Sequence, residues 1–293
     1  MSSSIRKGLE GVPQLTQQQI DFWNENGFII GGRLFDEREV DELREHMASV
    51  LAGRYETGTP PVTVHWRPGD PGTKLRVIDV AWPSDLVIRR AVLSPAVGSM
   101  AAQLTGAESI RIFTDALLHK PGVGDRATSS GMLGWHQDYN WWRYADPPHL
   151  LTARIALDYE TPENGCMQVI PGSHRWPLEG KAYYELETDF GAAPDSQMPA
   201  GERIAPIQCE LEPGHVMWHH CMTMHASPPN RTNKPRRSIL VRLMPGYTRY
   251  VADEASPGGV WQLLKGGKAK DGDLWEGEYF PRLWPVAREA SSA

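Results

Sequence analysis

Cysteine is scarce in this sequence, with three in 293 residues. Cys166, Cys209 and Cys221 form no CxxC pair, so the pattern predicts neither a disulfide framework nor a zinc site built from thiolates. The N-terminal segment also lacks the apolar core of a signal peptide. We therefore expect a protein of a reducing compartment, the cytoplasm.

Long apolar runs and clusters of basic residues are also missing. No stretch approaches the roughly 18 apolar residues that a membrane helix requires. Acidic residues outnumber basic ones, and the net charge is −6. Because a nucleic-acid-binding protein carries a basic surface, we expect neither a nucleic acid nor a membrane as partner. A small-molecule substrate fits this composition better.

Helix signatures come early in the chain. Thr16 with Gln19, and Asp36 with Glu39, each form a capping box, which marks a helix start. From residue 109 onward, stretches rich in β-branched and aromatic residues alternate with Gly, Pro and Asn turns. These stretches are 109–120, 151–160, 166–172, 207–214, 215–220 and 237–247. The order predicts a mainly β fold with flanking helices, a double-stranded β-helix (a cupin-like jelly roll).

The domain organisation is simple. Residues 1–14 have the composition of a flexible tail, and residues 15–293 contain neither a repeat nor a dividing linker. We therefore expect one domain, as a monomer or a small homo-oligomer. Residues 55–72, with four prolines and three glycines, form a loop long enough to have a function. Together with residues 121–134 they are candidate lids over a site.

The stretch GWHQDYNWW, residues 134–142, places His136 and Asp138 inside the densest aromatic cluster of the chain. A single His-x-Asp is close to chance frequency, and a salt-bridged surface turn would explain it at least as well. In an extended segment, residues i and i+2 project to the same side, so the pair could share a metal ion. Four histidines of one later segment are candidates for a third ligand: His215, His219, His220 and His225. His219 and His220 would face opposite sides of one strand, so one regular strand cannot supply both as ligands. Of the two, His220 is the candidate to contact a residue that binds the metal.

Two histidines and a carboxylate are the ligands of non-haem Fe(II) oxygenases, which leave the opposite face of the metal open for a chelating cosubstrate and dioxygen. A cosubstrate with two carboxylates needs a cation at its far end, and arginine pairs with a carboxylate through two hydrogen bonds. Arg236, 11 residues beyond His225, is our candidate, with Arg237 as the alternative register. Ser227 is close enough in sequence to add a hydroxyl donor.

Three blocks of the sequence resemble the signature blocks of a known family, the phytanoyl-CoA dioxygenases, which are Fe(II)- and 2-oxoglutarate-dependent oxygenases. The blocks are WHQDYNWW, ALDYETPENGCMQVIPGSHRW and PGHVMWHHCMTMHASPPNRTNKPRRS. The N-terminal LTQQQIDFWNENGFIIGGRLFDEREVDELREHM is similar to that family's opening helices and strand, so the resemblance runs from about residue 15 to 247. It implies a jelly-roll fold and an iron dioxygenase that consumes 2-oxoglutarate and O2.

The resemblance also implies a site, carried over position by position. His136, Asp138 and His225 would bind the iron, and Arg236 and Ser227 would hold the far carboxylate of 2-oxoglutarate. The related halogenases carry a small residue where this chain has Asp138, so the resemblance implies hydroxylation or desaturation instead.

Aromatic and basic residues around these positions are candidates for further contacts. We expect a substrate-binding wall close to the metal, formed by Trp135, Tyr139, Trp141 and Trp142. Arg76 and Arg154 lie on predicted strands in apolar company, and a buried arginine needs an anionic partner. That partner is an internal acid, a carboxylate of the cosubstrate or an acidic substrate. As hypotheses, we assign Arg76 to the cosubstrate and Arg154 to the substrate.

These expectations combine into a hydroxylase for an unactivated C–H bond of a small molecule, with release of succinate and CO2. The 11 tryptophans suit a medium-sized molecule with an apolar or sugar-like face, such as a secondary metabolite. Three alternatives remain open. The same site could perform desaturation or another oxidative tailoring step, the barrel could bind a small molecule without catalysis, or the protein could be a cupin-type metalloenzyme that needs no 2-oxoglutarate.

Overall fold

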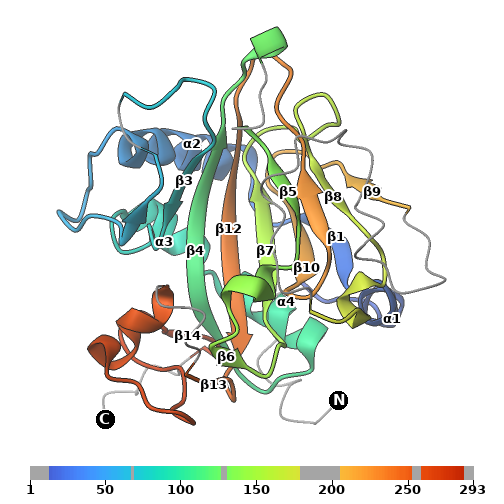
Figure 1. Ribbon diagram of the computed structural model, residues 1–293, viewed down its shortest axis with the longest axis vertical. Coiled ribbons are helices and arrows are strands. Elements are labelled where there is room, and N and C mark those ends of the chain that lie inside the picture. Colours follow the sequence, from blue (N-terminus) through green and yellow to red (C-terminus); the bar gives the residue numbers. More distant parts are fainter. Residues whose placement is uncertain (1–12, 67–68, 127–130, 179–204, 253–258, 287–293) are drawn as a thin grey trace.

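Two antiparallel sheets form the centre of the molecule, and helices cover the outer face of the larger sheet (Figure 1). The predicted jelly roll, mainly β with flanking helices, is confirmed. The computed structural model describes five stretches of the chain: residues 13–66, 69–126, 131–178, 205–252 and 259–286. The predicted tail lies almost entirely outside them, so the division of the chain into a tail and one domain stays a prediction.

The strands are short except for two long ones in the larger sheet. Within the described residues that sheet has eight strands, in the order β1 (Phe28–Arg33), β10 (His215–His220), β7 (Leu151–Ala156), β12 (Arg236–Pro245), β4 (Ile110–Lys120), β3 (Arg76–Asp79) and β2 (Thr63–Val64), with β14 (Arg282–Trp284) also paired to β4. The smaller sheet has the order β5 (Leu133–His136), β11 (His225–Ser227), β8 (Met167–Val169) and β9 (Ile207–Cys209). A separate pair consists of β6 (Ala145–Asp146) and β13 (Arg249–Tyr250).

Helices precede most of the strands, as predicted. They are α1 (Gln17–Asn26), α2 (Glu37–Leu51), α3 (Leu86–Val92) and α4 (Pro95–Thr105). Both predicted capping boxes form, at Thr16 and at Asp36. The seven-residue α3 was not predicted, since it is too short for a clear periodicity; Asp85 caps it by accepting hydrogen bonds from two backbone amides. None of the helices in the described stretches is long and apolar enough to cross a membrane.

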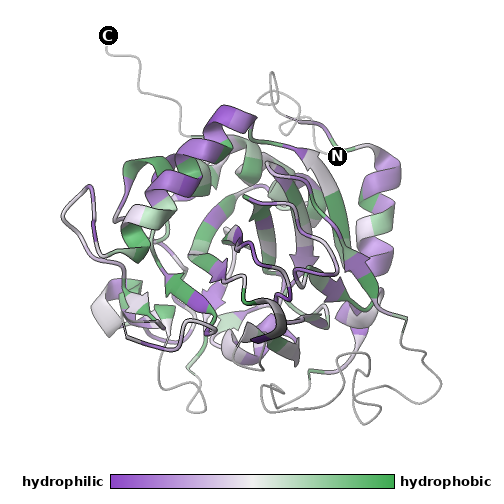
Figure 2. Ribbon diagram, turned by 90° about the horizontal axis from the view of Figure 1, so that it is seen from above, coloured by the Kyte–Doolittle hydropathy of each residue, from purple (hydrophilic) through white to green (hydrophobic). Residues whose placement is uncertain are grey.

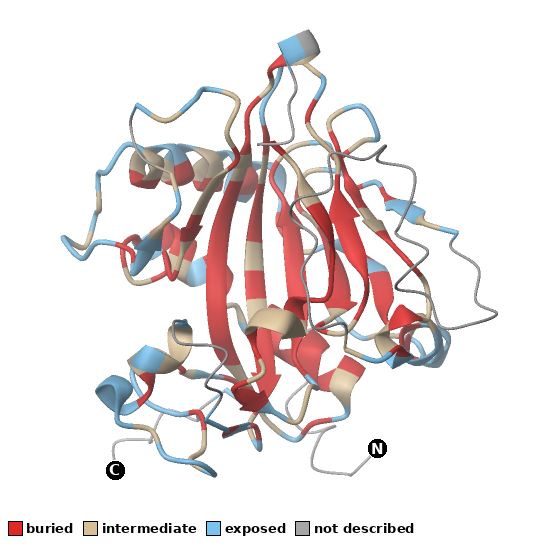
Figure 3. Cartoon of the chain, in the orientation of Figure 1, coloured by how far each residue is buried: buried red, intermediate tan, exposed pale blue. Residues whose placement is uncertain are grey.

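Strand β12 separates the core from the inside of the barrel, because side chains alternate along a strand. Ile239, Val241 and Leu243 pack outward into the main core cluster, where they meet apolar residues of α2, α3 and α4. Arg236 and Arg242 are on the other face. The central strands of the larger sheet are almost wholly buried (Figure 3), whereas the outer helices keep hydrophilic surfaces (Figure 2). The polar inner face of the sheet is therefore available for a site.

The C-terminal segment, which the sequence left unplaced, packs beside one end of β4 (Figure 1). It contains the 3-10 helix η7 (Val260–Gly267) and β14. Leu264, Trp275 and Phe280 join an aromatic cluster with Phe113 and Trp142. The segment thus supports the residues next to the predicted metal pair.

Candidate metal centre and active site

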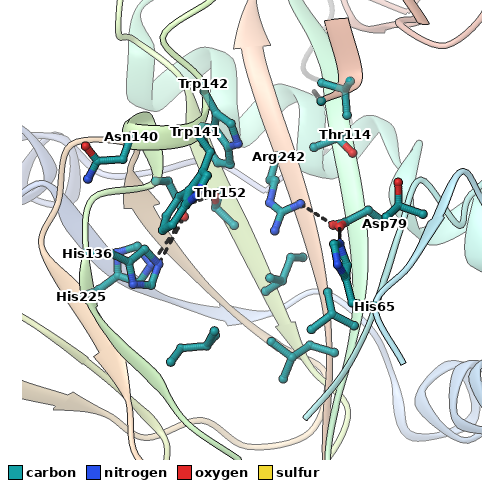
Figure 4. A pocket seen from close by; sticks show the side chains of 18 of the residues that line it. His65, Asp79, Thr114, His136, Asn140, Trp141, Trp142, Thr152, His225 and Arg242 are labelled. Carbon is teal, nitrogen blue, oxygen red and sulfur yellow. Dashed lines mark hydrogen bonds and ion pairs between the residues drawn. The ribbon is translucent and has the colours of Figure 1, made fainter. Parts of the chain in front are cut away.

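The three predicted metal ligands converge between the sheets. His136, Asp138 and His225 are buried and offer ligand atoms that lie within 4.8 Å of one another. His136 ends β5 and pairs directly with His225 at the start of β11, so both imidazoles enter the barrel side by side (Figure 4). Asp138 begins the 3-10 helix η4 (Asp138–Trp141). The extended segment that we predicted ends at His136, and a tight turn, not strand alternation, brings the carboxylate to the histidines.

Backbone carbonyls fix the orientation of both imidazoles. Nδ1 of His136 lies 2.6 Å from the carbonyl oxygen of Gly134, and Nδ1 of His225 lies 2.8 Å from that of Thr223. A carbonyl oxygen only accepts, so Nδ1 carries the proton and donates it. In the neutral tautomer that this contact selects, Nε2 has the lone pair that binds a metal.

The two oxygens of Asp138 have different neighbours. Oδ1 lies 3.5 Å from Nε2 of His136 and 3.7 Å from Nε2 of His225. Oδ2 accepts a hydrogen bond from the hydroxyl of Thr152 at 3.3 Å and faces Nε2 of His219 at 3.1 Å. One oxygen is thus held by the larger sheet, while the other is directed at the two imidazoles.

Burial and the neighbouring imidazoles set the charges of this centre. Burial opposes the ionisation of Asp138, but the imidazoles of His225, His136 and His219 hold the pKa of its carboxyl well below the usual range. Burial and the adjacent histidines lower the pKa of His225 well below its ordinary value. An ionised carboxylate and an imidazole without a proton on Nε2 are the forms that bind a metal. Two imidazoles and one carboxylate, buried and facing one point, fit Fe(II) with open positions for a cosubstrate and O2.

His219, and not the predicted His220, contacts a metal ligand. His219 faces Asp138, whereas the ring of His220 lies 6.3 Å from that of Trp23 and 5.7 Å from that of His174. The two residues do point to opposite sides of β10, as predicted, but the register could not be read from the sequence.

The position of His220 gives a testable pH dependence. Burial, followed by the nearby imidazole of His174, lowers the pKa of His220 to about 3. The unfolded chain binds a proton there at about pH 6.5 and the folded chain does not, so the free energy of unfolding should fall as the pH falls below about 6.5. In His220→Asn, which keeps an acceptor for the amide of Met222, this fall should be shallower. Urea unfolding at pH 7 and at pH 5 gives the free energy of unfolding at each pH. An equal difference between the two pH values in variant and parent would contradict the assignment.

A second polar cluster lies around Ser227. Its hydroxyl accepts hydrogen bonds from Nζ of Lys120 at 2.7 Å and from Nη2 of Arg236 at 3.1 Å, and it donates to the carbonyl of Gly165 at 3.0 Å. Arg236 also donates to that carbonyl. Lys120 and Arg236 are fully buried, while Ser227 lines the same cavity as the metal centre. The predicted pair of Arg236 and Ser227 thus exists, with Lys120 as a third member that the sequence did not assign.

This cluster holds more positive than negative charge. Glu160 accepts two hydrogen bonds from Nε of Arg154, at 2.9 and 3.0 Å, and lies 3.8 Å from Nη1 of Arg236. Within the described residues, that one carboxylate serves both arginines, and Nε of Arg236 has no hydrogen-bond partner. Burial, and then the charge of Arg236, lowers the pKa of Lys120 well below its ordinary value. An anionic group bound here would relieve this imbalance, as the far carboxylate of 2-oxoglutarate would.

The alternative register, Arg237, lies on the other face of β12. Its guanidinium makes two hydrogen bonds to Asp158, at 2.8 and 2.9 Å, and has no contact with Ser227. Arg236 is therefore the arginine that the strand turns toward the cavity.

The other predicted contacts are divided between the cavity and its surroundings. Trp141, Trp142 and Arg154 line the cavity. Trp135 packs in a separate apolar cluster, and Tyr139 packs against the aromatic cluster that contains Trp142. Their predicted roles as substrate contacts gain no support from these positions.

Arg76 also lies away from the cavity. Along β3, Val77 and Asp79 line the cavity, so the alternating side chain of Arg76 is directed to the opposite face. There its guanidinium lies over the ring of Trp66, 4.4 Å from the ring centre. Its assignment to the cosubstrate therefore has no geometric support.

The cavity has a volume of about 1020 Å³ and is bounded by both sheets and by the C-terminal segment. Leu133, His136 and His225 come from the smaller sheet, and Gly259 and Leu263 come from the C-terminal segment. Several further polar residues also line it: His65, Asp79, Thr114, Arg143, Thr152, His219 and Arg242. Their side chains come from segments far apart in the sequence, which is why only the folded chain shows them together.

Comparison with known proteins gives the same class. Residues 23–238 match the phytanoyl-CoA dioxygenase (PhyH) family. The chain is 25% identical to the methylphosphonate hydroxylase of Gimesia maris over 225 residues, which cover 77% of this chain and 79% of that protein. A solved non-heme α-ketoglutarate-dependent carbocyclase, SnoK from nogalamycin biosynthesis, is similar with a TM-score of 0.70, 25% identity and coverage of 92% of this chain and 96% of that one.

A third relative was solved with its cofactors. The epimerase SnoN, in complex with Fe³⁺, α-ketoglutarate and nogalamycin RO, has a TM-score of 0.68 at 21% identity and covers 91% of this chain and 98% of its own. Fold and centre together define an iron- and 2-oxoglutarate-dependent oxygenase. The chain belongs to the phytanoyl-CoA dioxygenase family, and it is an Fe(II)- and 2-oxoglutarate-dependent dioxygenase.

Proposed function

We propose that this dioxygenase hydroxylates an unactivated C–H bond of a small molecule, with His136, Asp138 and His225 as the iron ligands and with Arg236 and Ser227 at the far carboxylate of 2-oxoglutarate. The observation that carries the proposal is the convergence of the three side chains in one cavity with a buried surplus of positive charge. A carboxylate at position 138 leaves no room for a halide ligand, which favours hydroxylation.

The protein supplies orientation and a dry cavity for this chemistry. When bound, Fe(II) with 2-oxoglutarate and O2 supplies the oxidation: the keto acid becomes succinate and CO2, and one oxygen atom enters the C–H bond. Thr152 and His219 hold one oxygen of Asp138, so that the other stays directed at the imidazoles. The ring of Trp141, 5.2 Å from that of His136, covers one side of the centre and limits the access of water.

The cavity supports a medium-sized, largely apolar substrate. Its volume of about 1020 Å³ exceeds what 2-oxoglutarate needs, and tryptophan, valine and leucine side chains line it together with the polar groups. SnoK, from nogalamycin biosynthesis, is 25% identical to this chain, which supports a secondary metabolite as substrate. Because SnoK is a carbocyclase, a ring-forming oxidation at the same centre is the second candidate, and desaturation is the third.

Compartment and assembly belong to the same proposal. The cysteines Cys166, Cys209 and Cys221 are buried and free, as suits a cytoplasmic enzyme. We expect it to act as a monomer or a small homo-oligomer on a small molecule, without a nucleic acid or a membrane.

Spectroscopy tests the cofactor assignment before any substrate is known. Anaerobic addition of Fe(II) and 2-oxoglutarate should produce a weak visible charge-transfer band, because the keto acid chelates the metal through its carboxylate and its keto oxygen. Fe(II) alone and 2-oxoglutarate alone are the controls. A colourless sample of folded protein would contradict the proposal. Succinate release that needs 2-oxoglutarate, measured across a metabolite collection, then separates a dioxygenase from a cupin-type metalloenzyme and from a non-catalytic binder.

A further inference from the structure

A polar cluster on the cavity wall faces the metal centre and is not used by the proposed function. Nη1 of Arg242 lies 2.9 Å from Oδ1 of Asp79, and Nε2 of His65 lies 2.7 Å from Oδ2 of the same carboxylate. All three residues line the cavity, and Figure 4 shows Arg242 between the histidines of the metal centre and the Asp79–His65 pair. We call these three residues the Arg242 cluster.

The larger sheet places this cluster at a defined distance from the metal centre. Arg242 of β12 pairs in register with Thr152 of β7 and with Thr114 of β4, and Thr152 pairs with His219 of β10. The hydroxyl of Thr152 contacts Asp138. Neighbouring strands are about 4.8 Å apart, so Arg242 stands one strand away from a residue that touches a metal ligand. A substrate of two or three rings with a C–H bond at the metal would reach it.

The guanidinium is held in place and keeps donors for a ligand. Its central carbon lies 5.5 Å from the ring centre of Trp142, and Asp79 fixes one nitrogen. The side chain of Arg242 keeps 17% of its surface exposed, and Nη1 is the nitrogen that Asp79 binds. A guanidinium has five N–H donors, so an accessible donor remains for an acceptor on a molecule bound in the cavity.

Within this cluster the charges of Arg242 and Asp79 oppose each other, and the hydrogen bond to Asp79 raises the pKa of His65. Burial opposes the ionisation of Asp79, but the hydrogen bond from His65 and the charge of Arg242 together lower the pKa of its carboxyl. Burial would lower the pKa of Arg242, yet the charges of Asp79 and Asp138 raise it. Both groups are thus charged at neutral pH and cancel each other. An anion at Arg242 would also meet the repulsion of Asp79, whereas a neutral oxygen would not.

We propose that the Arg242 cluster binds an uncharged oxygen group of the substrate, a ketone, hydroxyl or ether, on an apolar ring frame that extends to the metal centre. The inference deepens the proposed function and rests on it. It names the substrate class as a neutral, oxygenated polycyclic molecule, as opposed to an acyl-CoA or a phosphonate.

Arg143 is the residue at which an anionic substrate would bind instead. It lines the same cavity, and no carboxylate of the described residues lies within 4.0 Å of its guanidinium. Its Nη2 donates only a long hydrogen bond, 3.4 Å, to the side chain of Asn140. Binding at Arg242 therefore predicts a neutral substrate, and binding at Arg143 predicts an anionic one. The experiment must distinguish these two substrates.

Three probes with the same frame measure this preference: trans-2-decalone, trans-decalin-2-carboxylate and trans-decalin. Binding to the metal-free protein is followed by quenching of tryptophan fluorescence, since Trp141 and Trp142 line the cavity. We expect the ketone to bind about 10-fold more tightly than the carboxylate and the hydrocarbon, which is the size of a hydrogen bond from a charged donor. Binding at equal strength to all three would overturn the inference.

Three variants identify the residue responsible. Arg242→Met should remove the preference for the ketone over the hydrocarbon. Asp79→Asn leaves the guanidinium uncompensated, so the carboxylate probe should gain about 10-fold and bind about as tightly as the ketone. The matched control is Arg237→Met, which breaks an arginine–aspartate pair of the same strand on the outer face and should keep the parent preference.

Other outcomes would place the substrate elsewhere. If the parent prefers the carboxylate and Arg143→Met removes that preference, the substrate is anionic and the inference is wrong. If Arg242→Met and Asp79→Asn weaken all three probes equally, the cluster is only structural, and the inference is wrong again. The visible Fe(II)–2-oxoglutarate band separates this failure from that of the proposed function. The band must form in the parent and in Arg242→Met; its absence from the parent refutes the function, and its presence without a ketone preference refutes only the substrate class.

Discussion

Replacing Asp138 with alanine should abolish oxygenase activity while leaving the protein folded. The carboxylate is the only anionic member of the metal centre within the described residues, and without it two neutral imidazoles must hold Fe(II). The centre also loses its hydrogen bonds to Thr152 and His219, which leaves His219 unpaired beside the cavity. We expect 2-oxoglutarate turnover to fall at least about 1000-fold, which corresponds to about 4 kcal/mol of lost stabilisation. Succinate release and Fe(II) titration measure the loss.

Asp79→Asn is the control for this variant. Asp79 is another acidic residue that lines the cavity, but it pairs with Arg242 and His65, away from the predicted ligands. Its replacement should leave the affinity for Fe(II) within about twofold of the parent, because no ligand atom is lost. If Asp138→Ala retained turnover, or if both variants lost iron to the same extent, the carboxylate would be misassigned.

Local signals in the sequence predicted the elements that depend on neighbouring residues. Both capping boxes form because each needs only a cap and a partner three residues later. The two long strands β4 and β12 follow from continuous β-branched and apolar runs. His136 and His225 come together because their strands pair in register. The resemblance to the family had already implied that both residues bind the same metal.

The errors have a common physical cause, the phase of side-chain alternation. Which of His219 and His220 faces the metal depends on a register that no local signal fixes, and a shift of one residue exchanges the two faces. The same ambiguity applied to Arg236 and Arg237, where the structure supports the first. The predicted inward direction of Arg76 was wrong. Val77 and Asp79 take the inward positions of β3, and Arg76 lies over Trp66 on the other face.

Contacts between distant segments could not be predicted from the sequence, because they depend on how the whole chain folds. The Arg242 cluster joins residues from β3, β12 and the segment around His65, and the donors around Ser227 join Lys120 to residues more than 100 positions away. Two hints were present in the sequence: Lys120 at the end of the apolar strand β4, and Arg242 inside the apolar strand β12. A buried charge requires a partner, so each residue predicts a polar contact. Their partners became visible only with the fold.

Replacing Arg236 with methionine should chiefly raise the 2-oxoglutarate requirement. The guanidinium is fully buried and reaches the hydroxyl of Ser227, so an anion bound there would lose its main charged donor. Lys120 shares that hydroxyl and would retain part of the attraction. We expect the KM for 2-oxoglutarate to rise about 100-fold, or about 2.7 kcal/mol, which is within the range for truncating one side of a buried charge pair. The affinity for Fe(II) should change little, since the ligands are untouched.

Arg237→Met is the matched control, because it removes the same side chain from the next position of β12. Arg237 pairs with Asp158 on the outer face, so its loss should leave the KM for 2-oxoglutarate within about twofold of the parent. Titration of the visible band with 2-oxoglutarate under anaerobic conditions reports binding directly, and far-ultraviolet circular dichroism verifies that each variant is folded. A large effect of Arg237→Met with a small effect of Arg236→Met would show that the carboxylate is bound from the other face of the strand. Equal small effects would move the anchoring role to Lys120, the other side chain that donates to Ser227.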